Sequence, residues 1–377
     1  MTSKNQSEWN AGRFFTTLNY FGEIPFIGSF RWAQQLLGQS PTVPGSKVSV
    51  LKRQVAVIGN SPALRFDPFF DSIQARLAPS MDVVFYPLTL GDRTAPATLN
   101  DGLRQLVQSV DSVIVLDTPS APASLLADIA AYLGENPEIA RRCIFDFSDP
   151  NIDLSAWGAL DDVVMGGVSE GKISLQAQAS AAVFSGYVST DNSGGFSSVR
   201  TRNFEPPFDF SGWSGMRLRV KGDGQRYKFI ARNREGWDSS AYIYSFDTVA
   251  DDWCDINVPF DEMAATFRAK SVADAPAFDP SKVVSLQLML SKFESDGRLN
   301  PHFMPGPFQL AVSGISVYRP RQGLPLIVVS QQDEVGQEQA TLNESMVNYR
   351  WIDANAVNVI EAIAAMLEKH KHMNEKP

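Results

Sequence analysis

The pattern of apolar residues changes twice along the chain, near residues 150 and 318, and this constrains the fold more than any other feature. Before the first change, short runs of branched apolar residues alternate with stretches of helical spacing, as at 54–59, 99–110 and 111–116. Strand–helix alternation of this kind predicts a parallel sheet with right-handed crossovers. Between the two changes, short alternating segments are separated by Gly, Asp, Asn and Pro, which is typical of an antiparallel sandwich.

The parallel-sheet pattern returns after residue 320, with a buried strand at 324–330 and an amphipathic helix at 356–370. We therefore expect an α/β plus all-β chain, in which a β-sandwich is inserted into, or appended to, a Rossmann-like parallel sheet. The expected parts are an aromatic N-terminal arm at 1–38, a linker at 39–52, the first part of the Rossmann-like domain at 53–149, the sandwich at 150–319 and the C-terminal part of the Rossmann-like domain at 320–377.

The N-terminal arm is rich in aromatic residues and poor in charge. One interpretation is peripheral contact with a membrane through residues 9–37, with Arg13 and Arg31 at headgroup level. The alternative is an arm that packs on the apolar surface of the main domain. No run of apolar residues is long enough to span a bilayer, and no secretory signal is found. We expect a cytoplasmic protein.

Composition excludes several classes of function. The formal net charge of −9 argues against a protein that coats nucleic acid, since that task needs clustered cations. The chain has two cysteines and three histidines, without metal-ligand spacing, so neither a disulfide scaffold nor a zinc site is expected. A reducing compartment follows as the expected location.

The first strand–helix turn of the parallel-sheet pattern is the place to look for a dinucleotide site. A pyrophosphate needs several glycines there, but the segment 59–65 keeps only Gly59 and has Pro62 and Leu64 in the following positions. The segment 54–118, together with the segment 324–368, resembles atypical short-chain dehydrogenases. Tyr86, Tyr132 and Tyr349 have no lysine four residues on, so the Tyr-x-x-x-Lys pair of that family is missing. We expect neither a cofactor nor catalytic residues.

The sandwich segment carries a series of ordered motifs, at 157–169, 182–190, 192–200, 218–227, 253, 258–260, 266–268, 286–291 and 306–308. Together they resemble the complex I intermediate-associated protein 30 family. The resemblance implies a galactose-binding-like jelly roll and a role in assembling large membrane complexes. A sandwich of this kind next to a dehydrogenase-like domain, with the opening at 9–25, is similar to biogenesis factors of oxygenic phototrophs. It implies partners among membrane-complex subunits or assembly intermediates, on a photosynthetic (thylakoid) or respiratory membrane.

One candidate site is a loop cluster at the start of the sandwich segment. Adjacent carboxylates followed by glycines could bind a hard cation, or they could form a tight turn in which Asp accepts from backbone N–H groups. The turn is the favoured interpretation, and no metal is expected. The residues concerned are Asp161, Asp162, Gly166, Gly167 and Asn192.

A second candidate is a basic strip around an expected hairpin at 222–224. Alternation places Met216, Leu218 and Val220 in the core and the cations between them on the other face. Such a strip could dock a client protein, or its charges could be neutralised by salt bridges within the chain. Its cations are Arg217, Arg219, Lys221, Arg226, Lys228 and Arg232.

These features favour a non-catalytic assembly or biogenesis factor that acts by protein–protein binding. An NAD(P)-linked oxidoreductase or nucleotide sensor is the first alternative, and nucleotide retained by the purified protein would favour it. An RNA-binding regulator of translation is the second alternative, which needs a salt-sensitive basic strip. A carbohydrate-binding module follows from fold analogy alone.

Overall fold

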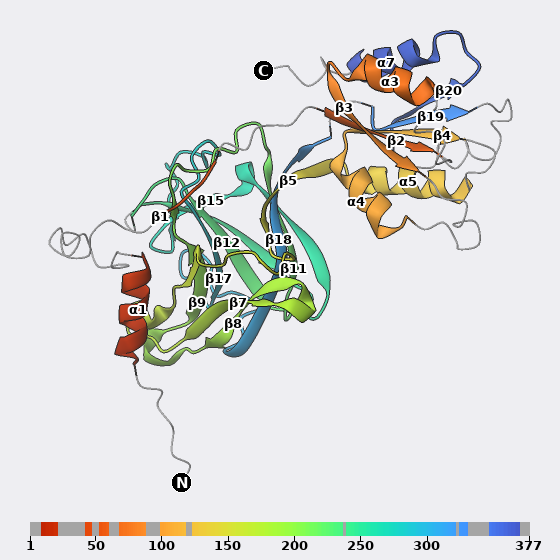
Figure 1. Ribbon diagram of the computed structural model, residues 1–377. Coiled ribbons are helices and arrows are strands. Elements are labelled where there is room, and N and C mark those ends of the chain that lie inside the picture. The colour runs from red at the N-terminus through yellow and green to blue at the C-terminus, as the bar shows by residue number, and fades with distance from the viewer. Residues whose placement is uncertain are drawn as a thin grey trace. The chain divides into compact units, whose positions relative to one another are not determined.

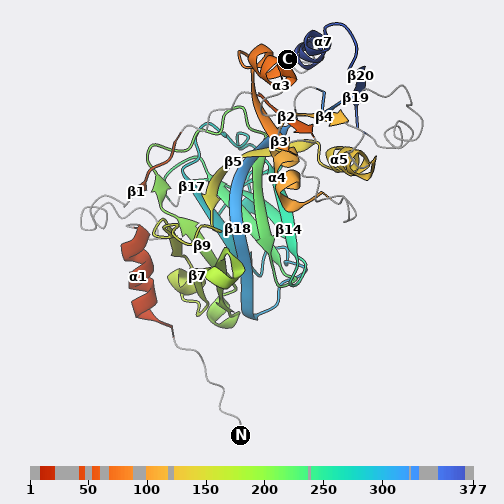
Figure 2. The same ribbon diagram turned by 45° about the vertical axis from the view of Figure 1, so that its right-hand side comes forward.

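The computed structural model (Figure 1 and, turned by 45°, Figure 2) describes residues 9–21, 42–46, 53–59, 68–87, 99–117, 123–236, 239–321, 324–330 and 347–369. The chain divides into two compact units. The first unit combines Met1–Val50 with Arg142–Val317, and the second combines Leu51–Arg141 with Tyr318–Pro377. The sandwich unit is therefore inserted in the sequence of the parallel-sheet unit, and the N-terminal arm belongs to the sandwich unit.

The first sheet of the sandwich contains six strands among the described residues, in the order β14-β11-β18-β8-β7, with β5 also paired to β18. All its ladders that are set out residue by residue are antiparallel. Its strands are β5 (Glu138–Asp146), β7 (Glu170–Gln176), β8 (Ala181–Val188), β11 (Gly215–Lys221), β14 (Trp253–Pro259) and β18 (Gly306–Pro320).

The second sheet contains seven strands within the described ranges, in the order β16-β15-β13-β12-β17-β9-β6. A short parallel pair, β1 (Thr42–Val43) with β10 (Asn203–Phe204), lies outside both sheets. The strands of the second sheet are β6 (Trp157–Ala159), β9 (Phe196–Thr201), β12 (Arg226–Arg232), β13 (Ala241–Asp247), β15 (Ala264–Phe267), β16 (Lys270–Ser271) and β17 (Ser285–Ser291).

One apolar core lies between the two sheets, and period-two alternation builds it. Met216, Leu218 and Val220 of β11 are fully buried in it, as the alternation predicted. Tyr227 and Phe229 of β12 enter the same core from the other sheet. The antiparallel sandwich expected between residues 150 and 318 is thus formed.

Strand β5 shows where the sequence pattern was misleading. The run 143–147 lies in the segment 53–149, which was expected to form the first part of the Rossmann-like domain. It instead belongs to the first sheet of the sandwich, where β5 pairs with β18. The two strands are far apart in sequence, and a short apolar run does not specify so distant a partner.

The second unit contains a five-stranded sheet in the order β20-β19-β4-β2-β3, in which every described ladder is parallel. Numbered along the chain, this order is 2-1-3-4-5, that of flavodoxin-like sheets rather than the 3-2-1-4-5-6 of dinucleotide-binding ones. A small parallel sheet is therefore present, as expected. Its strands are β2 (Arg53–Gly59), β3 (Met81–Pro87), β4 (Ser112–Asp117), β19 (Leu326–Ser330) and β20 (Tyr349–Asp353).

Two helices cover each face of this sheet (Figure 1): α3 (Pro68–Leu77) and α7 (Val359–Lys369) on one, α4 (Asp101–Ser109) and α5 (Ala123–Glu135) on the other. Helix α4 begins where Asn100 accepts a hydrogen bond from Leu103 N at 2.8 Å. Such a cap satisfies one of the free N–H groups of the first turn. The turn after β2 that was tested for glycines, residues 60–65, lies outside the described residues, as do His370 and His372.

Candidate functional site

The sandwich is open along one flank. Strand β14 is the last strand of its sheet in the described part of the chain, so no strand covers the side away from β11. On the other sheet, β15 pairs only with Ala241–Ile243 of β13. The second half of β13 therefore continues past the end of β15. The flank between β13 and β14 holds a pocket of about 420 Å³.

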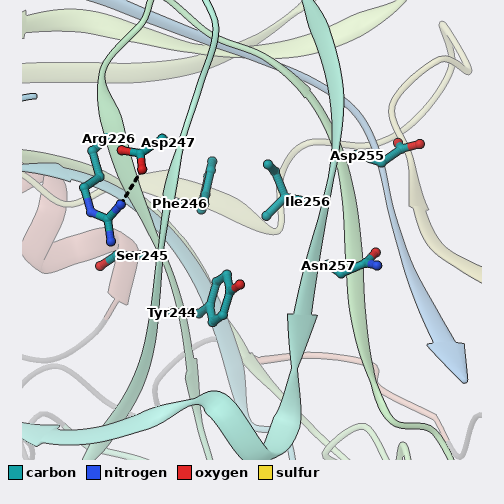
Figure 3. A pocket seen from close by; sticks show the side chains of 8 residues that line it. All are labelled: Arg226, Tyr244, Ser245, Phe246, Asp247, Asp255, Ile256 and Asn257. Atoms are coloured by element: carbon teal, nitrogen blue, oxygen red, sulfur yellow. Dashed lines mark hydrogen bonds and ion pairs between the residues drawn. The ribbon is translucent and has the colours of Figure 1, made fainter. Parts of the chain in front are cut away.

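The pocket is apolar between the strands and polar around them (Figure 3). Tyr244, Phe246 and Ile256 point into the space between β13 and β14 (Figure 3). Phe246 is almost fully buried and Ile256 is half-buried, and both pack against the sandwich core. The surrounding polar side chains are Arg226, Ser245 and Asp247 on the β13 side and Asp255 and Asn257 on β14.

Arg226 is held by two carboxylates beside this pocket. Its guanidinium lies 2.6 Å from Asp247 and 3.0 Å from Glu294. Asp247 also contacts Nδ1 of His302 at 2.9 Å, and Glu294 accepts from Ser245 Oγ at 2.7 Å. Because each partner is fixed by a further partner, the network holds the polar side of the pocket in one arrangement.

The ionisation of these groups follows from their partners. Partial burial by itself would raise the pKa of Asp247, but hydrogen bonds from Arg226 and His302 outweigh it and hold that pKa below its ordinary value. Burial raises the pKa of Tyr244, and the nearby Glu262 raises it further. At neutral pH the rim therefore carries the Asp247 carboxylate in its ionised form and the Tyr244 phenol in its neutral form.

The expected hairpin at 222–224 is not formed, because β11 and β12 belong to different sheets of the sandwich. The six predicted cations therefore do not share one face. Those of β11 lie on the outer side of one sheet, and those of β12 lie on the outer side of the other. Alternation specifies which side chains face the core, but it does not specify which sheet a strand joins.

Each predicted cation has a partner within the chain. On β11, Arg217 donates to Asn257, Arg219 lies 3.5 Å from Asp255, and Lys221 lies 3.6 Å from Asp251. On β12, Lys228 is buried, donates to the carbonyl of Phe293 and lies 4.0 Å from Glu294, while Arg232 donates to Ser239 O. Burial lowers the pKa of Lys228. Arg226 is the predicted cation that lines the pocket.

The loop cluster forms the tight turn in which Asp accepts from backbone N–H groups, which was the favoured interpretation. Asp162 is buried and accepts from Ser169 N and Oγ, Gly195 N and Phe196 N at 2.6–3.2 Å. Gly166 has a φ of 92°, and a Cβ on Gly167 would lie 2.3 Å from Asp162. Asn192 lies on the exposed turn 191–193 with a φ of 53°. No cluster of His, Cys, Asp or Glu in the described ranges could hold a metal ion.

Asp161 belongs instead to the binding site of the N-terminal arm. Its carboxylate accepts from Ser197 and Gly171 and forms an ion pair of 2.9 Å with Arg13 of α1 (Ala11–Phe21). Trp9 donates to Val163 O at 2.8 Å. The described part of the arm thus packs on the sandwich, and Arg13 is used there. The rest of the expected membrane-contact segment, residues 22–37, lies outside the described residues.

Sequence reasoning missed the flank pocket. Its apolar members, Tyr244, Phe246 and Ile256, look like ordinary core positions in a list of alternating residues. The available signal was the segment 251–262, which contains five acidic residues and no Lys or Arg. Charge of one sign concentrated on a strand and the turns at its two ends is a feature that partner binding can use.

The sandwich matches a known family. Residues 145–312 match the family model of the complex I intermediate-associated protein 30. An uncharacterized protein of Schizosaccharomyces pombe is 29% identical over 150 residues, which are 36% of this chain and 68% of that protein. The match covers the sandwich and leaves the parallel-sheet unit outside it.

Among solved structures, a family 11 carbohydrate-binding module from Clostridium thermocellum in complex with a mixed-linked tetrasaccharide is similar to the chain. The two are 17% identical, with a TM-score of 0.34, over 48% of this chain and 94% of that one. A family 29 carbohydrate-binding module from Piromyces equi is 12% identical, with a TM-score of 0.24, over 44% of this chain and 80% of that one.

Proposed function

We propose that this chain is a non-catalytic assembly or biogenesis factor for a membrane protein complex, and that it binds its partners through the sandwich. The observation that carries the proposal is the match of residues 145–312 to a family described by its association with complex I intermediates. The matched range lies within the sandwich unit and runs from the end of β5 into β18. The open flank of that unit is a surface through which partners could be bound.

We propose further that the client is a photosynthetic or respiratory complex, and that the protein acts at the cytoplasmic face of the membrane that holds this complex. The described residues contain no helix that is long and apolar enough to cross a membrane. Binding to subunits or assembly intermediates would bring the protein to the membrane.

Co-purification tests the proposal directly. The full chain with an affinity tag is isolated from membranes solubilised in a mild detergent, and the proteins bound to it are quantified by mass spectrometry. We expect enrichment of several subunits of one membrane complex, relative to cells that express the tag alone. A preparation that contains the tagged chain at full yield and no subunit of any membrane complex above the control would reject the function.

A nucleotide-linked role is the second candidate, and the five-stranded parallel sheet is the observation that favours it. Sheets of this class bind nucleotides at the carboxyl ends of their strands. We propose instead that this unit is a Rossmann-like relative that binds no nucleotide and serves as a scaffold. Chromatography of the small molecules released by denaturing the purified protein is then expected to give no stoichiometric NAD(P) or other nucleotide. Release of one nucleotide per chain would favour the second candidate.

A further inference from the structure

The free edge of β14 offers backbone groups to a partner strand. Phe260 N, just after the strand, donates to Ser214 O across the β11–β14 ladder at 2.9 Å. In an antiparallel ladder the N–H and C=O groups of successive residues point alternately to the two sides. The backbone groups of Trp253 and Asp255 therefore point away from β11, toward the open flank. An extended segment could pair with them as an added strand.

The charge along this edge selects the kind of partner. The segment 251–262, which contains the whole of β14, carries Asp251, Asp252, Asp255, Asp261 and Glu262, all exposed, and no Lys or Arg. Arg219 lies 3.5 Å from Asp255 and Lys221 lies 3.6 Å from Asp251, so part of the charge is neutralised within the sheet. The other three carboxylates leave the edge with a net negative charge. A second copy of the chain would bring the same acidic edge and be repelled.

The pocket beside the edge fits a long basic side chain. It combines the ring of Tyr244 with an apolar floor, and carboxylates of Asp247, Asp255 and Glu262 are near it. Among the described residues that line it, Arg226 is the cation, and it is already held by two carboxylates. Lys and Arg side chains pack an apolar stem on such a floor and place their charge beside aromatic faces and carboxylates.

We propose that the free edge of β14 and the flank pocket bind an extended, basic segment of a partner protein by strand addition, with a Lys or Arg side chain in the pocket. The inference rests on the proposed function, since the partner is the client. It adds to that function the surface, the geometry and the charge of the contact.

The test uses the full-length protein and two fluorescent synthetic peptides, one of alternating lysine and valine and one of alternating glutamate and valine. Binding is measured by fluorescence anisotropy at low and at physiological salt. Three variants probe the edge. Asp255→Lys reverses one charge, Asp255→Asn removes it, and Asp255→Pro also removes an N–H group that does not bond to β11. Asp191→Lys, on the exposed turn before β9, is the matched control for charge.

We expect the lysine peptide to bind and the glutamate peptide not to bind. Asp255→Lys should weaken the affinity about tenfold or more, while Asp191→Lys should leave it unchanged. Asp255→Pro should lose more affinity than Asp255→Asn, because it also lacks the backbone donor. In hydrogen–deuterium exchange, the bound lysine peptide should protect amides within 252–257. Equal affinity of Asp255→Lys and Asp191→Lys, or protection confined to other strands, would overturn the inference.

Co-purification of the variants and sedimentation of the wild-type chain distinguish failure of the binding surface from failure of the proposed function. If the wild-type chain co-purifies with a client and Asp255→Lys and Asp255→Pro co-purify with it equally well, the inference fails and the proposed function stands. If sedimentation shows a dimer of the wild-type chain that Asp255→Pro abolishes, the occupant of the edge is a second copy, and the basic partner is rejected.

Discussion

Asp162 is a buried carboxylate on which two segments of the sandwich converge. Four donor groups, from Ser169, Gly195 and Phe196, point at its two oxygens. The segment at 166–167 can approach it because Gly167 has no side chain, since a Cβ there would lie 2.3 Å from the carboxyl group. This residue therefore joins the loop before β7 to the loop before β9.

Asp162→Ala should destabilise the sandwich by about 2–4 kcal/mol, because it leaves several buried donors without an acceptor. The measurement is chemical denaturation followed by the fluorescence of the sandwich tryptophans. Asp191→Ala, on an exposed turn, is the control and should change the free energy of unfolding by less than about 0.5 kcal/mol. Equal stability of the two variants would show that the four hydrogen bonds do not hold the loops.

The sequence allowed both a cation site and a turn at Asp161 and Asp162, and the choice needed the structure. Adjacent carboxylates before glycines are compatible with either, because the pattern does not say where the neighbouring N–H groups point. The donors to Asp162 come from residues up to 34 positions away. The cation of Asp161 is Arg13, which is 148 positions away. Contacts of this separation do not follow from local pattern.

At the scale of elements, α1 is attached to the sandwich mainly by side chains near its two ends. Arg13 bonds to Asp161 and Glu170 near its start. Tyr20 donates to Ser155 O at 2.6 Å near its end, and Arg202 lies over the Tyr20 ring at 4.3 Å. Phe21 is buried with Leu160, Val163 and Val164. The helix thus covers an apolar part of the sandwich at the β6 edge.

Docking of α1 should depend on pH through Tyr20. Burial, partly offset by Arg202, raises the pKa of its phenol from 10.0 to about 12. In a detached helix the Tyr20 phenol would ionise near its ordinary pKa of 10.0. The docked state therefore binds more protons than the detached state between pH 10 and pH 12. Linkage then requires that docking is fully stable below pH 10 and weakens as pH rises from about 10 to about 12. Absorbance of phenolate at 295 nm measures this.

The control is Tyr20→Phe, whose titration should lack one phenol with a midpoint near pH 12. If the difference between the two titrations has its midpoint near pH 10, Tyr20 is exposed to solvent and α1 is not docked as described. The sequence placed an aromatic arm here and allowed both a membrane contact and packing on the main domain. Aromatic content alone does not distinguish these two, because lipid and a protein core both accept such rings.

The sequence predicted the elements better than their partners. The strand–helix alternation on both sides of the sandwich was predictable from apolar spacing, and α4 and α7 lie where that spacing placed helices. The sheet to which a strand belongs was not predictable. Strand β5 joins β18, and β11 and β12 lie in different sheets. The flank pocket depends on these pairings, since it exists where β14 and the end of β13 have no neighbour among the described strands.

At the scale of the whole molecule, the second unit is built from two pieces of sequence separated by the sandwich. A fully buried ion pair joins them, with Asp111 of the first piece 3.0 Å from Arg319 of the second. Arg321 donates to Val107 O at 3.0 Å and also to Val110 O, at the end of α4. The two pieces of the second unit are therefore held together by polar contacts as well as by the pairing of β4 with β19.

Arg319→Ala should destabilise the parallel-sheet unit by about 3–5 kcal/mol, because it removes the guanidinium that is paired with the buried Asp111 carboxylate and leaves the more distant charge of Arg53 to offset it. Calorimetry of the full chain measures this as a fall in the melting temperature of one transition, while the transition of the sandwich keeps its own. Arg350→Ala, on the exposed side of β20, is the control. A common shift of both transitions would show that the two units unfold together.

We propose that the chain helps to assemble a membrane protein complex, and deletion of its gene tests this. The most direct measurement is a native-gel profile of membrane complexes from cells that lack the chain, compared with cells that regain it from a plasmid. We expect one complex to fall in abundance and its smaller intermediates to accumulate, while transcripts of its subunits stay unchanged. Unchanged abundance of every membrane complex in the deletion strain would contradict it.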